Sequence, residues 1–296
     1  MKLAIVYNDD LPVNKLIEKA EKYFDKVLAL PVEGLRYVFD EEGNKAMYKD
    51  ANLCDFDAVY LRIHDFDLFF MEQIIEILKE NNVYMQMEPD SGLVASNKFL
   101  TMMRLRENGI PVADSVYALS PEVAVESTKS LGYPVAVKLL SGYGGKGVMR
   151  ASEKQDLRPL MDTLEMLEQS ICLQDFIEGK TKNVRIVVVG DKTFSMKFVP
   201  EEDEWRASPG SGGKKRKYDA SEDVRGIALE AAKVSGFDLC DVDLILSEKG
   251  IYVVEIDLIQ VTDDEACELT GTDLRDEIMF YIQEKVMDRK SGLDQA

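Results

Sequence analysis

The chain has 296 residues, with 36 lysines and arginines against 55 aspartates and glutamates, and its formal net charge is −19. At roughly 150 residues per domain, this length predicts about two domains or one elaborated domain, and a hydrophobic share of 46% is typical of a folded globular protein. The negative charge argues against nucleic acid or an anionic membrane as the main partner, because their phosphates would be repelled. A local basic pocket can still bind a small anion.

The first residues, MKLAIVYNDD, lack the basic and long apolar regions of a secretory leader. No apolar run approaches the ~20 residues that crossing a bilayer requires. The four cysteines lie far apart without a CxxC pair, and the single histidine, His64, supplies too little for a zinc site or for most histidine-dependent nucleophilic mechanisms. We therefore expect a cytoplasmic protein with reduced thiols.

Residues 1–88 alternate apolar strands with amphipathic helices, which predicts a parallel sheet covered by helices. The expected strands are Lys2–Tyr7, Val27–Leu30, Ala58–Arg62 and Val83–Gln86, and the expected helices are Val13–Tyr23 and Leu68–Glu80. No glycine-rich turn follows the first strand, so this unit carries no dinucleotide fingerprint.

A second unit is predicted from residue 89 to 173. Ser96 is the expected N-cap of a helix over Asn97–Glu107, which ends at an Asn-Gly pair and is followed by Pro111. The other expected strands are Ser115–Ala118, Val135–Leu140 and Gly147–Ala151, and the other expected helices are Pro121–Leu131 and Asp156–Glu168.

The remainder of the chain, residues 174–296, is predicted to be a third, strand-rich unit. Its expected strands, the first beginning just before the unit, are Ile171–Phe176, Val184–Val189, Thr193–Phe198, Asp241–Ser247 and Ile251–Leu258, and its expected helices are Ser221–Ser235 and Thr272–Arg289. A long polar loop is expected over residues 201–221, containing Arg206 and the basic run Lys214–Lys217. Loops of this length often act as lids over a binding site.

The segment VAVKLLSGYGGKGVMR contains Gly142, Gly144 and Gly147 in a GxGxxG pattern. A dinucleotide site requires a helix after the glycines, whereas a strand is expected here. The pattern therefore indicates a glycine flap between two strands, whose N–H groups would cover phosphates toward which Lys138 also points. A protein kinase flap is excluded because no His-Arg-Asp motif is present. A simple hairpin with a surface lysine remains an alternative.

Acidic residues alternate in two neighbouring segments, Asp241 and Asp243 in one and Glu255 and Asp257 in the other. Residues two apart in a strand share a face. A three-residue turn, 248–250, would close an antiparallel hairpin in which 247 faces 251, 243 faces 255 and 241 faces 257. Opposed like charges cost up to about 1 kcal/mol per pair, which a divalent cation with oxygen ligands would offset. Solvated surface carboxylates are the alternative.

In this order the segments resemble the ATP-grasp superfamily, and most closely its RimK-like amino-acid ligases, which are related to glutathione synthetase and the lysine-carrier ligases. The resemblance covers about residues 90–285 and rests on SNKFLTMMRLRENGIPVADS, YPVAVKLLSGYGGKGV, LQDFIEGK, NVRIVVVGDKTFSMKF and DVDLIL with YVVEID. It implies an α/β (α+β) ATP-grasp fold with an N-terminal βαβ pre-ATP-grasp domain (1–88), a small lobe with the glycine flap (89–173) and a large lobe with the metal site (174–296).

The resemblance implies ATP and Mg²⁺ as cofactors, with Mn²⁺ as an alternative ion, and it assigns the site residues. The implied nucleotide-binding residues are Lys98, Lys138, Gly142, Gly144, Gly145, Lys146, Gly147, Gln174, Asp175, Phe176, Ile177 and Lys180. The implied metal ligands are Asp243, Glu255 and Asp257, and the implied catalytic residues are Arg206, Arg185 and Lys138. Adenine would use backbone groups of Asp175–Ile177.

The chain departs from the family pattern at several of these positions. Asp257 stands where the family usually has Asn, the proline usually found near Gln260 is absent, and Ala207 replaces the Asn after the loop arginine. Asn97 replaces the Asp of an Asp-Lys pair, and Asp241 occupies a position that is normally small. The departures concentrate around the acyl phosphate and its acceptor.

We therefore expect an ATP-dependent carboxylate–amine ligase that forms an amide bond through an acyl phosphate, adding glutamate or another amino acid. Its substrates would be small-molecule or peptide carboxylates and amines. The Lys214–Lys217 run would attract acidic ones, and a solvated charged loop is an equal alternative for this run. Relatives suggest a homo-oligomer, either a dimer or a tetramer. Two alternatives stay open: a non-catalytic nucleotide-binding regulatory protein with the same fold, and a phosphotransferase acting on a small molecule.

Overall fold

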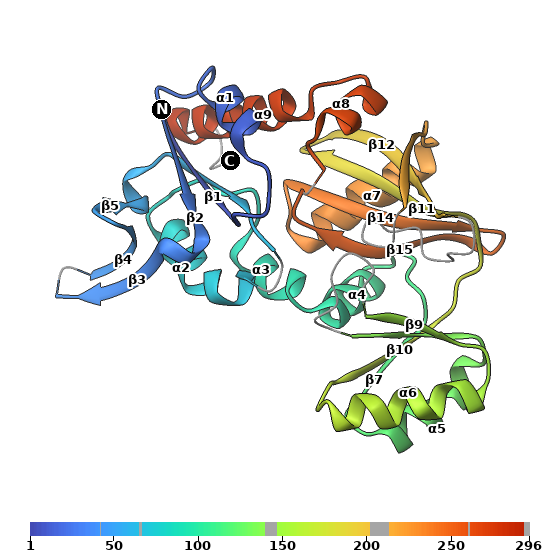
Figure 1. Cartoon of the computed structure of the whole chain (residues 1–296). Helices are drawn as coiled ribbons and strands as arrows, with labels where there is room; N and C mark the ends of the chain where they lie inside the picture. The colour runs from blue at the N-terminus through green and yellow to red at the C-terminus, as the bar shows by residue number, and fades with distance from the viewer. Residues whose placement is uncertain (42, 65–66, 140–146, 202–212, 260, 293–296) are drawn as a thin grey trace.

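The structure, a computed structural model, describes residues 1–41, 43–64, 67–139, 147–201, 213–259 and 261–292. Figure 1 shows three parts: an N-terminal unit, a large sheet with its helices, and a smaller lobe below that sheet. Along the described ranges, no helix is both long enough and apolar enough to cross a membrane.

The N-terminal unit contains a parallel sheet, as the alternation of strands and helices predicts. Its strands are β1 (Lys2–Tyr7), β2 (Lys26–Pro31) and β6 (Ala58–Arg62), in the order β2-β1-β6, and its helices are α1 (Asn14–Ala20) and α2 (Leu68–Glu80). The central strand β1 is apolar and almost fully buried because helices and neighbouring strands cover both of its faces.

Two features of this unit differ from the sequence prediction. A small antiparallel sheet of β3 (Leu35–Asp40), β4 (Gly43–Tyr48) and β5 (Ala51–Asn52) projects from it (Figure 1) and was not expected. The expected strand at 83–86 is wrong, since only Tyr84 forms a bridge, to Ala58. Instead, the side chain of Gln86 accepts a hydrogen bond from the Leu61 N–H at 3.0 Å and donates one to the Leu61 carbonyl at 2.6 Å. These side-chain bonds take the place of the main-chain bonds that a further strand would form with Leu61.

The smaller lobe is a four-stranded antiparallel sheet covered by two helices. The elements are β7 (Ser115–Ala118), α5 (Pro121–Leu131), β8 (Val135–Lys138), β9 (Val148–Ala151), α6 (Lys154–Met166) and β10 (Ile171–Asp175), with strand order β7-β10-β8-β9. Its apolar side chains form a hydrophobic cluster of their own, drawn from residues 118–173.

The large sheet carries five antiparallel strands in the order β13-β12-β11-β14-β15. The elements of this part are β11 (Gly179–Val189), β12 (Lys192–Val199), β13 (Lys214–Lys217), α7 (Glu222–Ser235), β14 (Leu239–Ser247), β15 (Gly250–Asp257), α8 (Asp264–Thr270) and α9 (Leu274–Ser291). The sequence analysis missed β13, which it placed in a polar loop, and α8.

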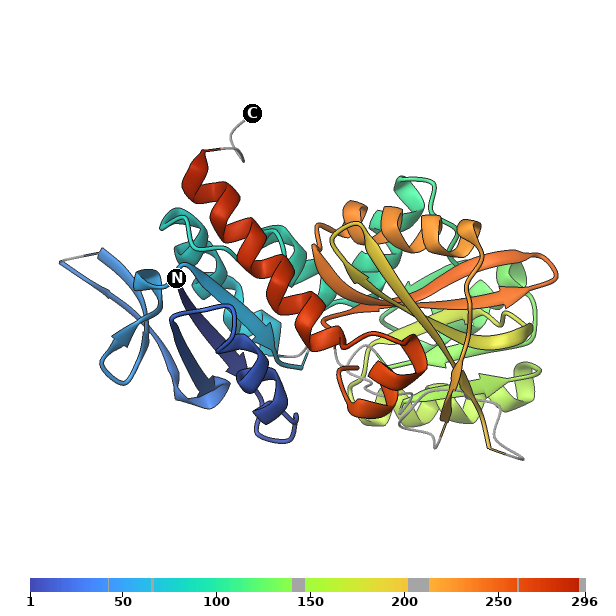
Figure 2. The same ribbon diagram turned by 90° about the horizontal axis from the view of Figure 1, so that it is seen from above.

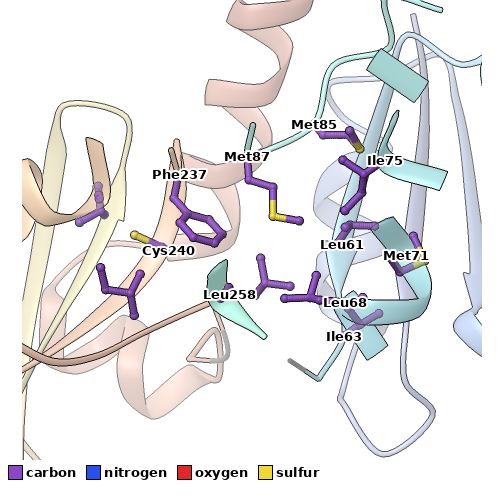
Figure 3. Close-up of a cluster of buried hydrophobic side chains, with 14 of the residues drawn as sticks. Leu61, Ile63, Leu68, Met71, Ile75, Met85, Met87, Phe237, Cys240 and Leu258 are labelled. Atoms are coloured by element: carbon purple, nitrogen blue, oxygen red, sulfur yellow. The ribbon is translucent and has the colours of Figure 1, made fainter. Parts of the chain in front are cut away.

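The large sheet and the N-terminal unit share one continuous core. Figure 3 shows Leu61, Ile75 and Met87 from the N-terminal side packed toward Phe237 and Cys240 of the large lobe. Two helices, α3 (Pro89–Ala95) and α4 (Lys98–Glu107), follow at this junction, and α4 packs against α7 and β15. The domain boundaries at residues 88 and 173 stay a prediction.

Helix α9 also ties these two parts together. It runs between them in Figure 2 and packs along α1. Lys19 of α1 forms ion pairs with Asp273 and Asp276 at 2.9 and 2.5 Å, and Lys290 pairs with Asp57 at 2.7 Å. These contacts, together with the shared core, hold the N-terminal unit beside the large sheet.

Candidate active site

The four alternating carboxylates lie on neighbouring strands at the edge of the large sheet. Asp241 pairs with Asp257 and Asp243 with Glu255 in the β14–β15 ladder, as expected. The turn differs, because Ser247 pairs with Gly250 and not with residue 251. A β-bulge between Asp243 and Leu244 then shifts the register by one residue and brings the acidic positions opposite each other.

Arg185 of β11 binds two of these carboxylates inside the protein. Its Nε and Nη2 donate to Oδ1 and Oδ2 of Asp243 at 2.7 and 2.8 Å, and Nη1 donates to Asp241 Oδ2 at 3.4 Å. All three residues are at most 6% exposed. Burial alone would lower the pKa of Arg185, but Asp243 and Asp241 outweigh burial and raise it. Arg185 is therefore a permanent cation in this site.

Lys98 contacts the acidic face from helix α4, which packs against β15. It is the first residue of α4, whose N-cap is Asn97, because the Asn97 side chain accepts hydrogen bonds from the N–H groups of Phe99 and Leu100. The expectation that Ser96 caps this helix is therefore wrong by one residue. Lys98 forms an ion pair with Glu255, so a predicted phosphate ligand and a predicted metal ligand are in direct contact.

Lys138 is the last residue of β8 and lies opposite Cys172 of β10. Its side chain is half-buried. Burial, together with the nearby positive charge of Lys98, lowers the pKa of Lys138 to about 8. A lysine with this pKa is partly neutral near physiological pH and becomes fully charged when an anion approaches.

The predicted adenine segment lies where β10 leaves the smaller lobe. Gln174 is buried and donates to Ser115 Oγ at 2.9 Å. The N–H groups of Asp175 and Phe176 donate to main-chain carbonyls of the smaller lobe at 2.8 and 3.3 Å. Among the described residues the Ile177 N–H has no acceptor. Of the three N–H groups in the predicted adenine segment, two are therefore already bonded within the protein.

Several predicted site residues lie outside the described ranges. They are Gly142, Gly144, Gly145, Lys146 and Arg206. Gly147 directly precedes β9, and Lys180 is placed on β11. The described part of the site therefore brings together Lys98, Arg185 and the carboxylates, with Lys138 near Lys98.

The basic run belongs to a strand and not to a loop, because residues 214–217 pair with β12 as strand β13. Lys215 forms ion pairs with Asp263 and Glu265 near the start of α8. The other three basic residues of the strand are exposed.

Two aromatic partners of the site were missed by the sequence analysis. The guanidinium of Arg185 lies over the ring of Phe198 at 5.3 Å from the centroid, and that of Arg150 lies over the ring of Phe176 at 4.4 Å. Alternation along β12 predicts which face Phe198 occupies, but strand order decides that Arg185 lies beside it. Asn183 adds a polar contact, since its Nδ2 lies 3.4 Å from Asp243 Oδ2.

The acidic face has the donor chemistry of a magnesium site. Asp243, Glu255 and Asp257 offer carboxylate oxygens, which hard divalent cations prefer. In this arrangement Arg185 occupies both oxygens of Asp243, and Lys98 contacts Glu255. Among the described residues, no group of three or more acidic, histidine or cysteine side chains is spaced to hold a metal ion. The ligand types fit Mg²⁺, but their spacing does not, so Lys98 would have to leave Glu255 and the carboxylates would have to rearrange before an ion could bind.

Two antiparallel sheets that are joined after β10, with Lys98 paired to a carboxylate of the larger sheet, are consistent with an ATP-grasp ligase. The profile of the RimK-like ATP-grasp domain matches residues 95–282. The chain belongs to this family of ATP-dependent, amide-forming ligases. The family assignment confirms the resemblance found in the sequence and favours an enzyme over the non-catalytic alternative.

A curated relative and two solved structures illustrate the similarity. A probable alpha-L-glutamate ligase of Histophilus somni (strain 2336) is 31% identical over 206 residues, 69% of each chain. The RimK domain protein ATP-grasp from Sphaerobacter thermophilus DSM 20745 superposes with a TM-score of 0.73 at 17% identity, covering 95% of this chain and 99% of its own. ATP-grasp ligase PsnB, complexed with minimal precursor, Mg and ADP, gives 0.71 at 18% identity, covering 96% and 98%.

Proposed function

We propose that this ligase uses ATP to join L-glutamate, through its amino group, to a carboxylate substrate. Two observations support the proposal. Lys98 pairs with an acidic sheet face that also carries a buried arginine, and Lys138 lies near Lys98, which is a suitable set of charges for a nucleotide, a metal ion and a carboxylate. The relatives at about 30% identity are probable alpha-L-glutamate ligases.

In the proposed mechanism, Lys98 and Lys138 bind the triphosphate and orient its terminal phosphorus toward the substrate carboxylate. The carboxylate attacks and ADP leaves, and the glutamate amine then displaces phosphate from the acyl phosphate. Such transfers depend mainly on positioning and charge stabilisation. Arg185 holds Asp243 in place, and Arg206 is the second proposed catalytic arginine.

Asp243, Glu255 and Asp257 would hold Mg²⁺, or Mn²⁺ in its place. A bound ion of this kind neutralises phosphate charge during transfer. When the triphosphate arrives, Lys98 can exchange its carboxylate partner Glu255 for a phosphate oxygen, because the phosphate carries more negative charge. This exchange would make Glu255 available at the moment when the nucleotide enters.

We propose that the substrate that supplies the carboxylate carries several acidic groups. Lys214, Arg216 and Lys217 lie exposed along the edge strand β13, which follows the Arg206 segment in the sequence. In a protein of net charge −19, an exposed group of three cations at one sheet edge gives a local positive field. This field would attract a small molecule or peptide with several carboxylates.

The experiment is a ligation assay with purified protein, ATP, Mg²⁺, L-glutamate and a panel of acidic carboxylate acceptors. We expect ADP and phosphate in equal amounts and a product heavier than its acceptor by one glutamyl residue. Replacing glutamate with glutamine, aspartate or alanine tests the amine substrate. If ATP binds but no acceptor supports ADP release, the proposed ligation is wrong. A stable phosphorylated product without free phosphate would instead indicate a phosphotransferase.

We also propose a cytoplasmic location and a homo-oligomeric state. The reduced-thiol expectation supports the first, since all four cysteines are free. Light scattering of the purified chain distinguishes a monomer from a dimer or tetramer.

A further inference from the structure

A cavity lies away from the proposed active site, at the junction between the N-terminal unit and the large lobe. It is a cavity of about 510 Å³, formed by the end of α2, the segment from residue 82 to 89, Asp238 and helix α9. None of the proposed nucleotide or metal ligands lines it. Helix α9, which contributes Lys285 and Arg289 to the lining, runs between the N-terminal unit and the large lobe in Figure 2.

Charges of both signs line this cavity. Three are cations, Lys79 of α2 and Lys285 and Arg289 of α9, and two are carboxylates, Glu88 and Asp238. The lining therefore has one excess positive charge within a protein of net charge −19. Lys285 and Arg289 are one helical turn apart, so their side chains can act on the same ligand group.

The internal contacts hold part of this lining in place. The hydroxyl of Tyr84 donates to Asp238 Oδ2 at 2.9 Å, and the guanidinium of Arg289 lies 5.1 Å from the centroid of the Tyr84 ring. Glu88 lies 3.7 Å from Lys79, where both side chains are more than half exposed. Glu88 can therefore exchange Lys79 for another ammonium group at little cost.

The position of Lys285 is not explained by the helix end. Cations in the last turn of a helix favour its negative terminus, and Arg289 and Lys290 stand there in α9. Lys285 lies six residues before the last residue, Ser291, beyond the reach of that effect. Its side chain lines the cavity, and its charge lowers the pKa of Asp238 against the larger effect of burial, which raises it.

Apolar side chains form a smaller part of the lining, whose surface is mainly polar. Val83, Met85 and Met87 are all at most 6% exposed and line the cavity behind the charged residues. Ligand sites in proteins typically measure about 300–1,000 Å³, so this cavity has a suitable size.

We propose that this cavity is a second binding site for a small zwitterion, an acidic amino acid or a short acidic peptide. The carboxylates of the ligand would contact Lys285 and Arg289, and its ammonium group would contact Glu88. Each charged group of the ligand would thus face a group of opposite charge in the lining. The net charge of the ligand, about −1, is opposite in sign to the net charge of the lining. The site is separate from the one that the ligation reaction would use.

The test measures binding of L-glutamate, glutarate and 4-aminobutyrate by NMR and calorimetry, with ATP absent. Glutarate lacks the ammonium group, and 4-aminobutyrate lacks the second carboxylate, so both should bind at least tenfold more weakly than L-glutamate. The dipeptide Glu-Glu tests the peptide form of the ligand. Failure of both L-glutamate and Glu-Glu to bind at millimolar concentration overturns the proposal.

Variants separate this cavity from the active site. Lys285→Met with Arg289→Met should weaken L-glutamate binding at least tenfold, whereas Lys233→Met, on the exposed surface of α7, should not change it. Glu88→Gln should weaken L-glutamate binding and strengthen glutarate binding, a reversal that general unfolding cannot produce. If the double variant binds L-glutamate like the parent, binding occurs elsewhere and the proposal is wrong. The ligation assay of these variants judges the proposed function independently.

Discussion

Arg185 holds Asp243 by two parallel hydrogen bonds, Nε to Oδ1 at 2.7 Å and Nη2 to Oδ2 at 2.8 Å, across the neighbouring strands β11 and β14. The two residues are 58 positions apart in the sequence and almost completely buried. A guanidinium in this geometry fixes the plane of the carboxylate. Asp243 is thus oriented before any metal ion or nucleotide binds.

Removing this arginine should destabilise the fold. Arg185→Met leaves Asp241 and Asp243 buried without their cation, so we expect the free energy of unfolding to fall by about 3–5 kcal/mol. Urea denaturation measures the change. Arg158→Met, on the exposed face of α6, is the matched control and should stay within about 0.5 kcal/mol of the parent.

The cause of that loss can be tested by removing the charges as well. Adding Asp241→Asn and Asp243→Asn to Arg185→Met should recover part of the lost stability, because the uncompensated carboxylates are then gone. A triple variant that is less stable than Arg185→Met would contradict the electrostatic explanation and indicate lost packing against Phe198.

The N-cap of α4 gives a second, smaller effect. Asn97→Ala removes the acceptor for the N–H groups of Phe99 and Leu100, and we expect a loss of about 1 kcal/mol in urea denaturation. Asn97→Asp keeps an oxygen at the same place and adds a favourable charge at the helix start, so it should equal or exceed the parent. An Asn97→Asp variant as unstable as Asn97→Ala would argue against capping.

Amphipathic periodicity was sufficient to predict much of the fold. The predicted bounds of Leu68–Glu80 and Pro121–Leu131 coincide with α2 and α5, because apolar residues repeat along them at helical spacing and Ser120 caps α5. The hairpin of β3 and β4 lacks this signal. Its strands have mostly exposed or half-exposed side chains, so no clear apolar face marks them in the sequence.

The acidic face was predicted for partly the wrong reason. Sequence spacing indicates a three-residue turn, whereas the structure has a two-residue turn and a bulge that together give the same pairing of Asp243 with Glu255. A bulge leaves no mark in a run of apolar strand residues. The pairing of Arg185 with Asp243 was equally hidden, since it depends on which strands of the large sheet become neighbours.

The lowered pKa of Lys138 predicts a pH dependence of nucleotide binding. Its pKa is about 8 in the folded protein, against an ordinary value of 10.5, so the lysine loses its charge as pH rises through 8. ATP affinity should fall over this range by up to about tenfold per pH unit, as measured by calorimetry. Lys138→Arg keeps its charge at these pH values and should remove this dependence.

The lowered pKa of Lys138 also makes the stability of the protein depend on pH, in the direction opposite to that of ATP affinity. Between pH 8 and 10.5 the unfolded chain holds more protons at Lys138 than the folded chain, so this residue makes the protein more stable as pH rises. The urea concentration at the midpoint of unfolding should therefore rise with pH more in the parent than in Lys138→Met. A constant difference would show that Lys138 has an ordinary pKa.

The ion pair between Lys98 and Glu255 predicts that Lys98 competes with the metal ion. In Lys98→Gln, Glu255 is no longer neutralised by an ammonium group, so the nucleotide-free protein should bind Mn²⁺ at least tenfold more tightly, while its affinity for ATP should fall because a phosphate ligand is lost. Electron paramagnetic resonance measures bound Mn²⁺ directly. Lys154→Gln, at the exposed start of α6, should alter neither affinity. Unchanged Mn²⁺ binding in Lys98→Gln would mean that Glu255 is not a metal ligand, whereas opposite shifts of the two affinities would place Lys98 between the metal and the nucleotide.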